Sequence, residues 1–175
     1  MHLPADAHVE EAADAEGLVE ARAVVDELLA PAAGVLLQGA LGQGQEVAAA
    51  LHDAGLRLDR VFTSPLVRAT QTAEILAAHG GFEGPLSVWS ALAGGTTAMA
   101  LAALDEALPE ETMALVGHEP LVRAMVSRLA GVPSMFGFRT GGTCLVELRG
   151  DRGEFRWMLD PRTLERVSKV EDLGV

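Results

Sequence analysis

Residues 59–73 read DRVFTSPLVRATQTA, and residues 113–125 read MALVGHEPLVRAM. In each stretch a short apolar run is followed by polar residues, a proline and an amphipathic segment, which indicates a buried strand that leads directly into a helix. In open α/β sheets, ligands bind where such strands end. The free amides and the dipole of a helix start favour an anion. The two stretches therefore predict a phosphate-sized binding site at one edge of a sheet.

The segments around these two stretches predict further alternating helices and strands. Apolar spacing and Gly or Pro punctuation predict helices over 16–30, 45–55, 65–79, 98–108 and 120–130. Apolar or alternating runs predict strands over 34–38, 59–63 and 113–117 and a hairpin of 143–148 with 154–160. Ser64 is expected to cap its helix, with Pro65 as the first helical residue. The pattern predicts one α/β domain over 1–175, a three-layer α/β/α arrangement with a mostly parallel sheet.

Composition limits the classes of function. The chain has 175 residues, of which 49% are hydrophobic, enough for one sizeable core. A formal net charge of -12 opposes binding to nucleic acid and to anionic membranes, since both depend on Lys and Arg. The lone Cys144 and the absence of a long apolar N-terminal run predict a cytoplasmic protein without structural disulfides. No His and Cys spacing is typical of a structural zinc site.

Three segments carry a resemblance to a known family. Residues 64–73 resemble the S-P-x-x-R-x-x-Q-T-A element of the histidine phosphatase superfamily, and residues 117–120 resemble its second catalytic histidine loop. Phe138 to Gly142 and the hairpin that ends in Trp157 to Arg162 are similar to the SixA-type phosphohistidine phosphatases. The resemblance extends from about residue 55 to 164, and it implies the phosphoglycerate-mutase-like fold.

The resemblance also implies a chemistry and a set of site residues. Family members transfer a phosphoryl group to a histidine and then hydrolyse the phosphohistidine, with two histidines and two arginines around the phosphate. By resemblance, Arg68 and His118 are catalytic, and both bind phosphate together with Ser64. Residues 90–95 contain no carboxylate to protonate an alcohol leaving group, which matches the phosphohistidine branch; Glu119 is the fallback acid. The expected partner is a protein that carries phosphohistidine, or a small phosphorylated substrate, with no metal or organic cofactor.

The predicted nucleophile is less well matched. The family places this histidine on its first strand, in a hydrophobic-R-H-G-E segment, and alignment of residues 1–10 puts His8 there. Ala7 then stands in place of the arginine and Val9 in place of the glycine. Arg22, Arg123 and Arg139 are the candidates for the missing cation.

Two alternatives to an active enzyme remain open. The first is a catalytically impaired relative, a pseudo-phosphatase that binds phosphate or a phosphorylated protein. The second is a dinucleotide-binding protein of Rossmann type, because residues 34–44 run strand, glycine turn and helix, with Asp59 about twenty residues after Gly39. Its glycines follow G-x-x-G-x-G, which differs from the fingerprint of that fold.

Overall fold

The computed structural model describes residues 33–38, 44–102, 104, 111–133, 136–149 and 152–173, with backbone only for 33–38 and 152. The helices are α2 (Gly44–Asp53), α3 (Val67–His79), α4 (Ala91–Gly94), α5 (Thr97–Ala102), α6 (Leu121–Ala130) and the 3-10 helix η1 (Val170–Asp172). The strands are β1 (Ala33–Gln38), β2 (Arg60–Thr63), β3 (Leu86–Val88), β4 (Met113–Gly117), β5 (Thr143–Arg149), β6 (Arg152–Leu159) and β7 (Arg166–Val167). The helix predicted over 16–30 lies outside these residues.

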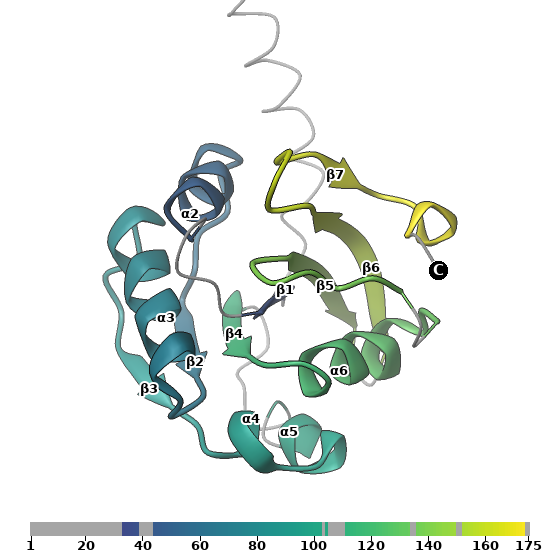
Figure 1. Ribbon diagram of the computed structural model, residues 1–175, viewed down its shortest axis with the longest axis horizontal. Coiled ribbons are helices and arrows are strands. Elements are labelled where there is room, and N and C mark those ends of the chain that lie inside the picture. The colour runs from purple at the N-terminus through teal and green to yellow at the C-terminus, as the bar shows by residue number, and fades with distance from the viewer. Residues whose placement is uncertain are drawn as a thin grey trace, which may run out of the picture.

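The strands form one sheet in the order β3-β2-β4-β1-β5-β6-β7 (Figure 1). The pairs β3/β2, β2/β4 and β4/β1 are parallel. The pairs β1/β5, β5/β6 and β6/β7 are antiparallel. The sheet therefore has a parallel half, made of the first four strands in this order, and an antiparallel half that begins with the predicted hairpin.

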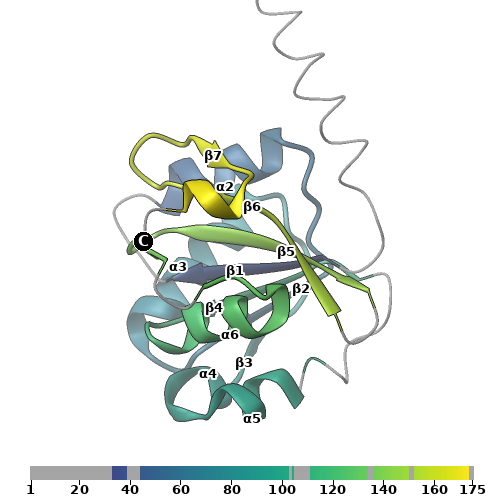
Figure 2. The same cartoon turned by 90° about the vertical axis from the view of Figure 1, so that its right-hand side faces the viewer.

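Helices cover both faces of this sheet, which confirms the predicted three-layer α/β/α arrangement (Figure 2). One core cluster joins α2 and α3 to the sheet through Ala114 and Val116 of β4. The other joins α4, α5 and α6 to the opposite face through Leu115. Successive residues of a strand point to opposite faces, so a strand buried on both sides is apolar throughout. All five residues of β4 are buried for this reason.

The four parallel strands end at the same edge of the sheet, which faces the reader in Figure 1. The antiparallel strand β5 begins at this edge and β6 ends there. Thr143, the first residue of β5, pairs with Leu37 of β1 and with Leu159, the last residue of β6. The residues after β2 and β4, the residues before β5 and the residues after β6 therefore all lie at the edge where β1 ends. We call it the carboxyl edge.

The structure corrects the predicted start of α3. Leu66, in extended conformation, is the N-cap residue, no side chain caps the helix, and the first helical residue is Val67. The prediction of Ser64 as N-cap and Pro65 as the first helical residue is therefore wrong. The hydroxyl of Ser64 accepts a hydrogen bond from the backbone amide of Leu66 at 3.2 Å, within the turn that precedes the helix. Among the described residues, no side chain accepts a hydrogen bond from the amides of Val67 and Arg68, the first two residues of the helix.

The sequence pattern did not predict several short helices and strands. The stretch between residues 79 and 98, for which no helix or strand was predicted, contains β3 and α4, and α5 starts at Thr97. The three residues of β3 and four of α4 are too few to show a period. Within the described part of the chain, no helix has the length and apolar character needed to cross a membrane.

Candidate phosphate site

Ser64 and His118 meet at the carboxyl edge although 54 positions separate them. Ser64 follows β2 and His118 follows β4, and these two strands are parallel neighbours. The hydroxyl of Ser64 and Nε2 of His118 share a hydrogen bond of 2.7 Å. Ser64 is fully buried, at 0% exposure. The bond is compatible with both protonation states of the ring, since a hydroxyl donates to a neutral Nε2 and accepts from a protonated one.

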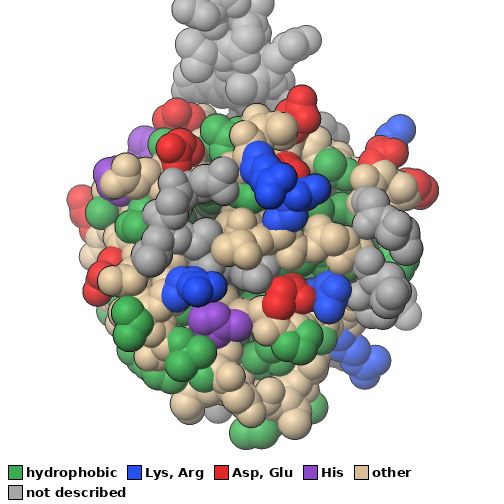
Figure 3. Space-filling model, viewed as in Figure 1, with side chains coloured by type: hydrophobic (Ala, Val, Ile, Leu, Met, Phe, Trp, Pro, Cys, Tyr) green, Lys and Arg blue, Asp and Glu red, His purple; other side chains and the backbone are tan. Residues whose placement is uncertain are grey.

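Arg68 lies next to this pair, on the first turn of α3. Its side chain is exposed to solvent. Burial lowers the pKa of His118 below its usual value of 6.5, and the charge of Arg68 lowers that pKa further. A guanidinium acts on an imidazole in this way only when the two are close together. Figure 3 shows this face, with a histidine directly beside a cationic side chain near its centre. The structure therefore brings Arg68, Ser64 and His118 together.

Glu119, the residue after His118, is held by an arginine of α6. Its Oε2 forms an ion pair of 3.1 Å with Nε of Arg123, one helical turn along. Burial raises the pKa of the Glu119 carboxyl, and the charge and backbone amide of Arg123 oppose that rise. Its Oε1 is buried without a hydrogen-bond partner among the described residues. Arg123, one candidate for the missing cation, is thus engaged by a carboxylate.

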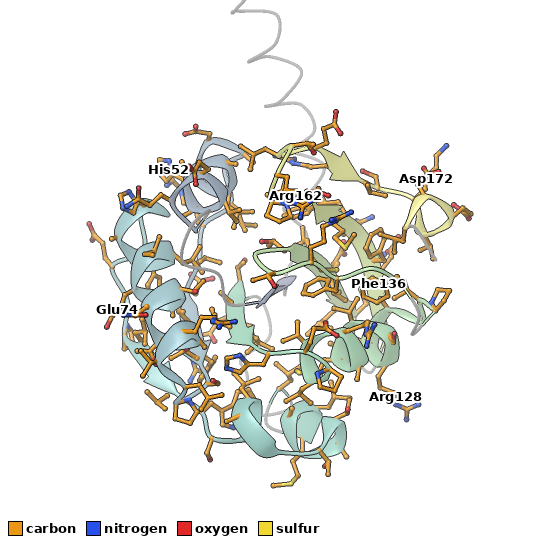
Figure 4. The ribbon with its side chains drawn as sticks, viewed as in Figure 1. His52, Glu74, Arg128, Phe136, Arg162 and Asp172 are labelled. Atoms are coloured by element: carbon orange, nitrogen blue, oxygen red, sulfur yellow. The ribbon has the colours of Figure 1, made fainter. Side chains whose placement is uncertain are left out.

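Two further arginines lie at the carboxyl edge, where β5 begins and β6 ends. Arg139 forms an ion pair of 3.4 Å with Asp160. The backbone amide of Arg162 donates to the same carboxylate at 2.8 Å. Figure 4 shows Arg162 in the upper part of this face, between α2 and β7 in the view, whereas Arg128 points outward from the rim. Arg162 follows the last strand of the hairpin, and its side chain is exposed at this edge of the sheet.

The central strand β1 contains no histidine that could serve as the nucleophile. The position between β4 and β5 is filled by β1, which reads AGVLLQ and contains no histidine. Its last residue, Gln38, pairs with Gly117, the residue before His118. His8 and Arg22 lie outside the described residues, so their predicted roles stay predictions.

These residues form a site suited to a tetrahedral anion. Arg68 supplies a planar cationic fork that matches two phosphate oxygens. His118 adds a donor and, when protonated, a second positive charge. Within the described part of the chain, no group of three or more His, Cys, Asp or Glu side chains is arranged to hold a metal ion.

The pH dependence of anion binding tests this arrangement. We expect the affinity for sulfate, whose charge is constant between about pH 5 and 8, to rise as pH falls below the usual His118 pKa of 6.5. The lowered pKa of His118 means that the free ring is neutral at pH 7, and a bound dianion offsets the charge of Arg68 and favours protonation. Isothermal titration calorimetry at several pH values measures this proton uptake. A His118→Asn variant that keeps the same slope would contradict the prediction, because Glu119 and the arginines are unchanged in it.

Comparison with known proteins identifies the relatives of this fold. A family model of the histidine phosphatase superfamily (branch 1) matches residues 36–93, about a third of the chain. An uncharacterized protein of Picosynechococcus sp. is 42% identical over 76 residues, which are 42% of this chain and 46% of that protein. The match thus spans about half the length of that curated relative.

Solved structures match more of the chain. The protein histidine phosphatase SixA, in complex with tungstate, has a TM-score of 0.69 at 22% identity and covers 76% of this chain and 99% of its own. The phosphoglycerate mutase of Plasmodium falciparum has a TM-score of 0.56 at 15% identity, with 78% and 94% covered. The alpha-ribazole phosphatase of Shigella flexneri has a TM-score of 0.56 at 14% identity, with 82% and 98% covered. The predicted resemblance and the phosphoglycerate-mutase-like fold are confirmed.

Proposed function

We propose that this chain, which has the histidine phosphatase fold, is a phosphohistidine phosphatase-like protein that binds the phosphoryl group between Arg68 and His118. The observation that carries the proposal is the meeting of Arg68, Ser64 and His118 at the ends of β2 and β4. A phosphoryl group needs fixed cations and donors at its oxygens, because negative charge redistributes over them during transfer. The tungstate that SixA holds in its solved complex is an anion of the same tetrahedral shape.

Phosphohistidine is the favoured substrate because the site has few carboxylic acids that could protonate a leaving group. Ser90 to Gly95, which lead into and out of the short helix α4, contain no carboxylate. The nearest acid in sequence, Glu119, is tied to Arg123. An imidazole leaves phosphorus with little help, whereas an alcohol needs a proton. We assign the site to a phosphoramidate bond, carried by a protein.

In the active form the nucleophile is a histidine, and His8 is our candidate. A nitrogen of the nucleophile attacks phosphorus, the bond between phosphorus and the substrate imidazole breaks, and the leaving ring takes up a proton. Water then attacks the enzyme phosphohistidine, which releases inorganic phosphate and restores the free histidine. Arg68 and His118 bind the equatorial oxygens in both steps.

A second function is favoured by β1. This strand ends beside the His118 loop, and its residues Ala33–Gln38 include neither histidine nor arginine. A site that contains no nucleophilic histidine would bind the phosphoryl group without turnover. The chain would then be a pseudo-phosphatase that recognises a phosphorylated protein.

Phosphoramidate hydrolysis separates the two functions. If the chain is an enzyme, the full-length protein releases phosphate from phosphoramidate, and His8→Ala abolishes the release while sulfate binding persists. If it is a pseudo-phosphatase, the wild type shows no release, yet binds a stable phosphohistidine analogue such as phosphoryltriazolylalanine. Turnover that survives in His8→Ala would refute His8 as the nucleophile. If Arg68→Ala keeps both turnover and anion binding, the phosphate site itself is refuted.

A further inference from the structure

We propose that Leu66, Val67 and Val88 form an apolar lip that docks large apolar side chains flanking the phosphohistidine of the partner protein. This inference rests on the proposed function, since it names what else the partner must present when its phosphoryl group lies at Arg68. The lip is a surface of this chain beside the phosphate site and separate from the phosphate-binding groups.

The lip stands out among the exposed apolar side chains. Val67 is 71% exposed, Val88 61% and Leu66 50%. They are three of the five exposed large apolar side chains that the described residues contain, the others being Met99 and Leu164. Single exposed apolar residues are ordinary, but clustered ones mark sites of interaction.

The fold brings the three residues to one corner of the carboxyl edge. Val88 pairs with Thr63, the last residue of β2. Leu66 and Val67 follow three and four positions after Thr63, in the turn that opens α3. Arg68 is the next residue after Val67, so the lip lies directly beside the phosphate-binding arginine in the sequence. Figure 3 shows apolar side chains next to the cationic and histidine side chains on this face.

Charge favours an anionic protein partner at this corner. The chain has a net charge of -12, yet its cationic side chains gather in the middle of this face while acidic ones lie mostly toward its rim (Figure 3). Such a local positive patch on an acidic protein steers an anionic partner to one face. A small phosphorylated substrate would meet only Arg68 and His118 and would leave the lip in water. A protein or peptide that places apolar residues beside its phosphohistidine covers it.

Three probes with the same phosphoryl head group test the lip by isothermal titration calorimetry. They are free phosphoryltriazolylalanine, a peptide in which serines flank this residue, and a peptide in which leucines flank it. We expect the leucine peptide to bind the wild type roughly tenfold more tightly than the serine peptide, as burial of part of two leucines would give. The double variant V67S/V88T should lose this preference. Met99→Ser, at a side chain that is 59% exposed on α5, is the matched control and should keep it.

The outcomes separate the lip from the phosphate site. Equal binding of the two peptides to the wild type overturns the lip, as does a preference that survives in V67S/V88T or disappears in Met99→Ser. Failure of the free analogue to bind the wild type refutes the phosphate site and with it the proposed function. Binding of the free analogue without any peptide preference refutes the lip alone.

Discussion

Arg68→Ala is expected to weaken the binding of tungstate or sulfate about a hundredfold. The guanidinium can donate two charge-assisted hydrogen bonds to one tetrahedral anion, each contributing about 1.5 kcal/mol. Alanine removes both and leaves the anion facing His118, whose pKa is still lowered by burial. Titration calorimetry at pH 7 and low salt measures the change. We expect the same substitution to remove any phosphoramidate turnover.

The controls for this prediction use other arginines. Arg128→Ala removes an equal charge from the exposed end of α6, where the side chain points away from the carboxyl edge (Figure 4), and should leave affinity nearly unchanged. Arg68→Lys keeps the charge but loses the planar fork, so we expect it to recover only part of the affinity. Equal losses in Arg68→Ala and Arg128→Ala would mean that the anion responds to overall charge, and the assigned site would be abandoned.

Gly153→Ala is expected to lower the free energy of unfolding by about 3 kcal/mol. Gly153 lies on β6 under the end of α6. A Cβ atom there would lie 2.8 Å from the carbonyl oxygen of Leu129 and 2.7 Å from Cγ1 of Val146. Real Cβ contacts are not this short, so the helix must move away from the sheet. A thermal melt should show a decrease of roughly 6 to 12 °C in Tm.

Gly94→Ala is the matched control for this glycine effect. A Cβ atom at Gly94 has no neighbour within 4 Å, and the residue lies in the short helix α4, where alanine is the better helix former. We expect its Tm to be equal to that of the wild type or slightly higher. A Gly153→Ala variant that melts with the wild type would show that α6 packs less closely on β6 than the structure has it.

Local patterns along the chain were sufficient to predict the main elements of the fold. The apolar runs of β2 and β4, and the amphipathic segments that follow them, predicted two strand-to-helix connections, because a buried strand and a covering helix each have their own period. Residues 143–160 alternate in polarity and predicted the hairpin of β5 and β6. Three short motifs, at residues 64–73, 117–120 and 138–162, also carried the resemblance to the histidine phosphatases. These predictions succeed because each depends on residues within one segment.

The sequence could not predict the contacts between segments. The residues around Ser64 in the sequence predict a helix cap. They do not show that its hydroxyl forms a hydrogen bond with His118, 54 positions away. Likewise, Glu147 looks like a surface residue of a hairpin, yet it is 3% exposed and accepts hydrogen bonds from Arg149 and Arg156. Such pairings depend on strand order and register, which only long-range packing decides.

The sequence by itself therefore determined the α/β class, the two strand-to-helix connections and the residue types suited to a phosphoryl group. The tertiary structure alone decided that β2 and β4 are neighbours, that Arg68 and His118 consequently meet, and that Arg162 and the apolar lip share their edge. It also placed Ala33–Gln38 at the centre of the sheet. The physical reason is that periodicity and helix punctuation act over a few residues, whereas a site at a sheet edge exists only after distant strands have paired.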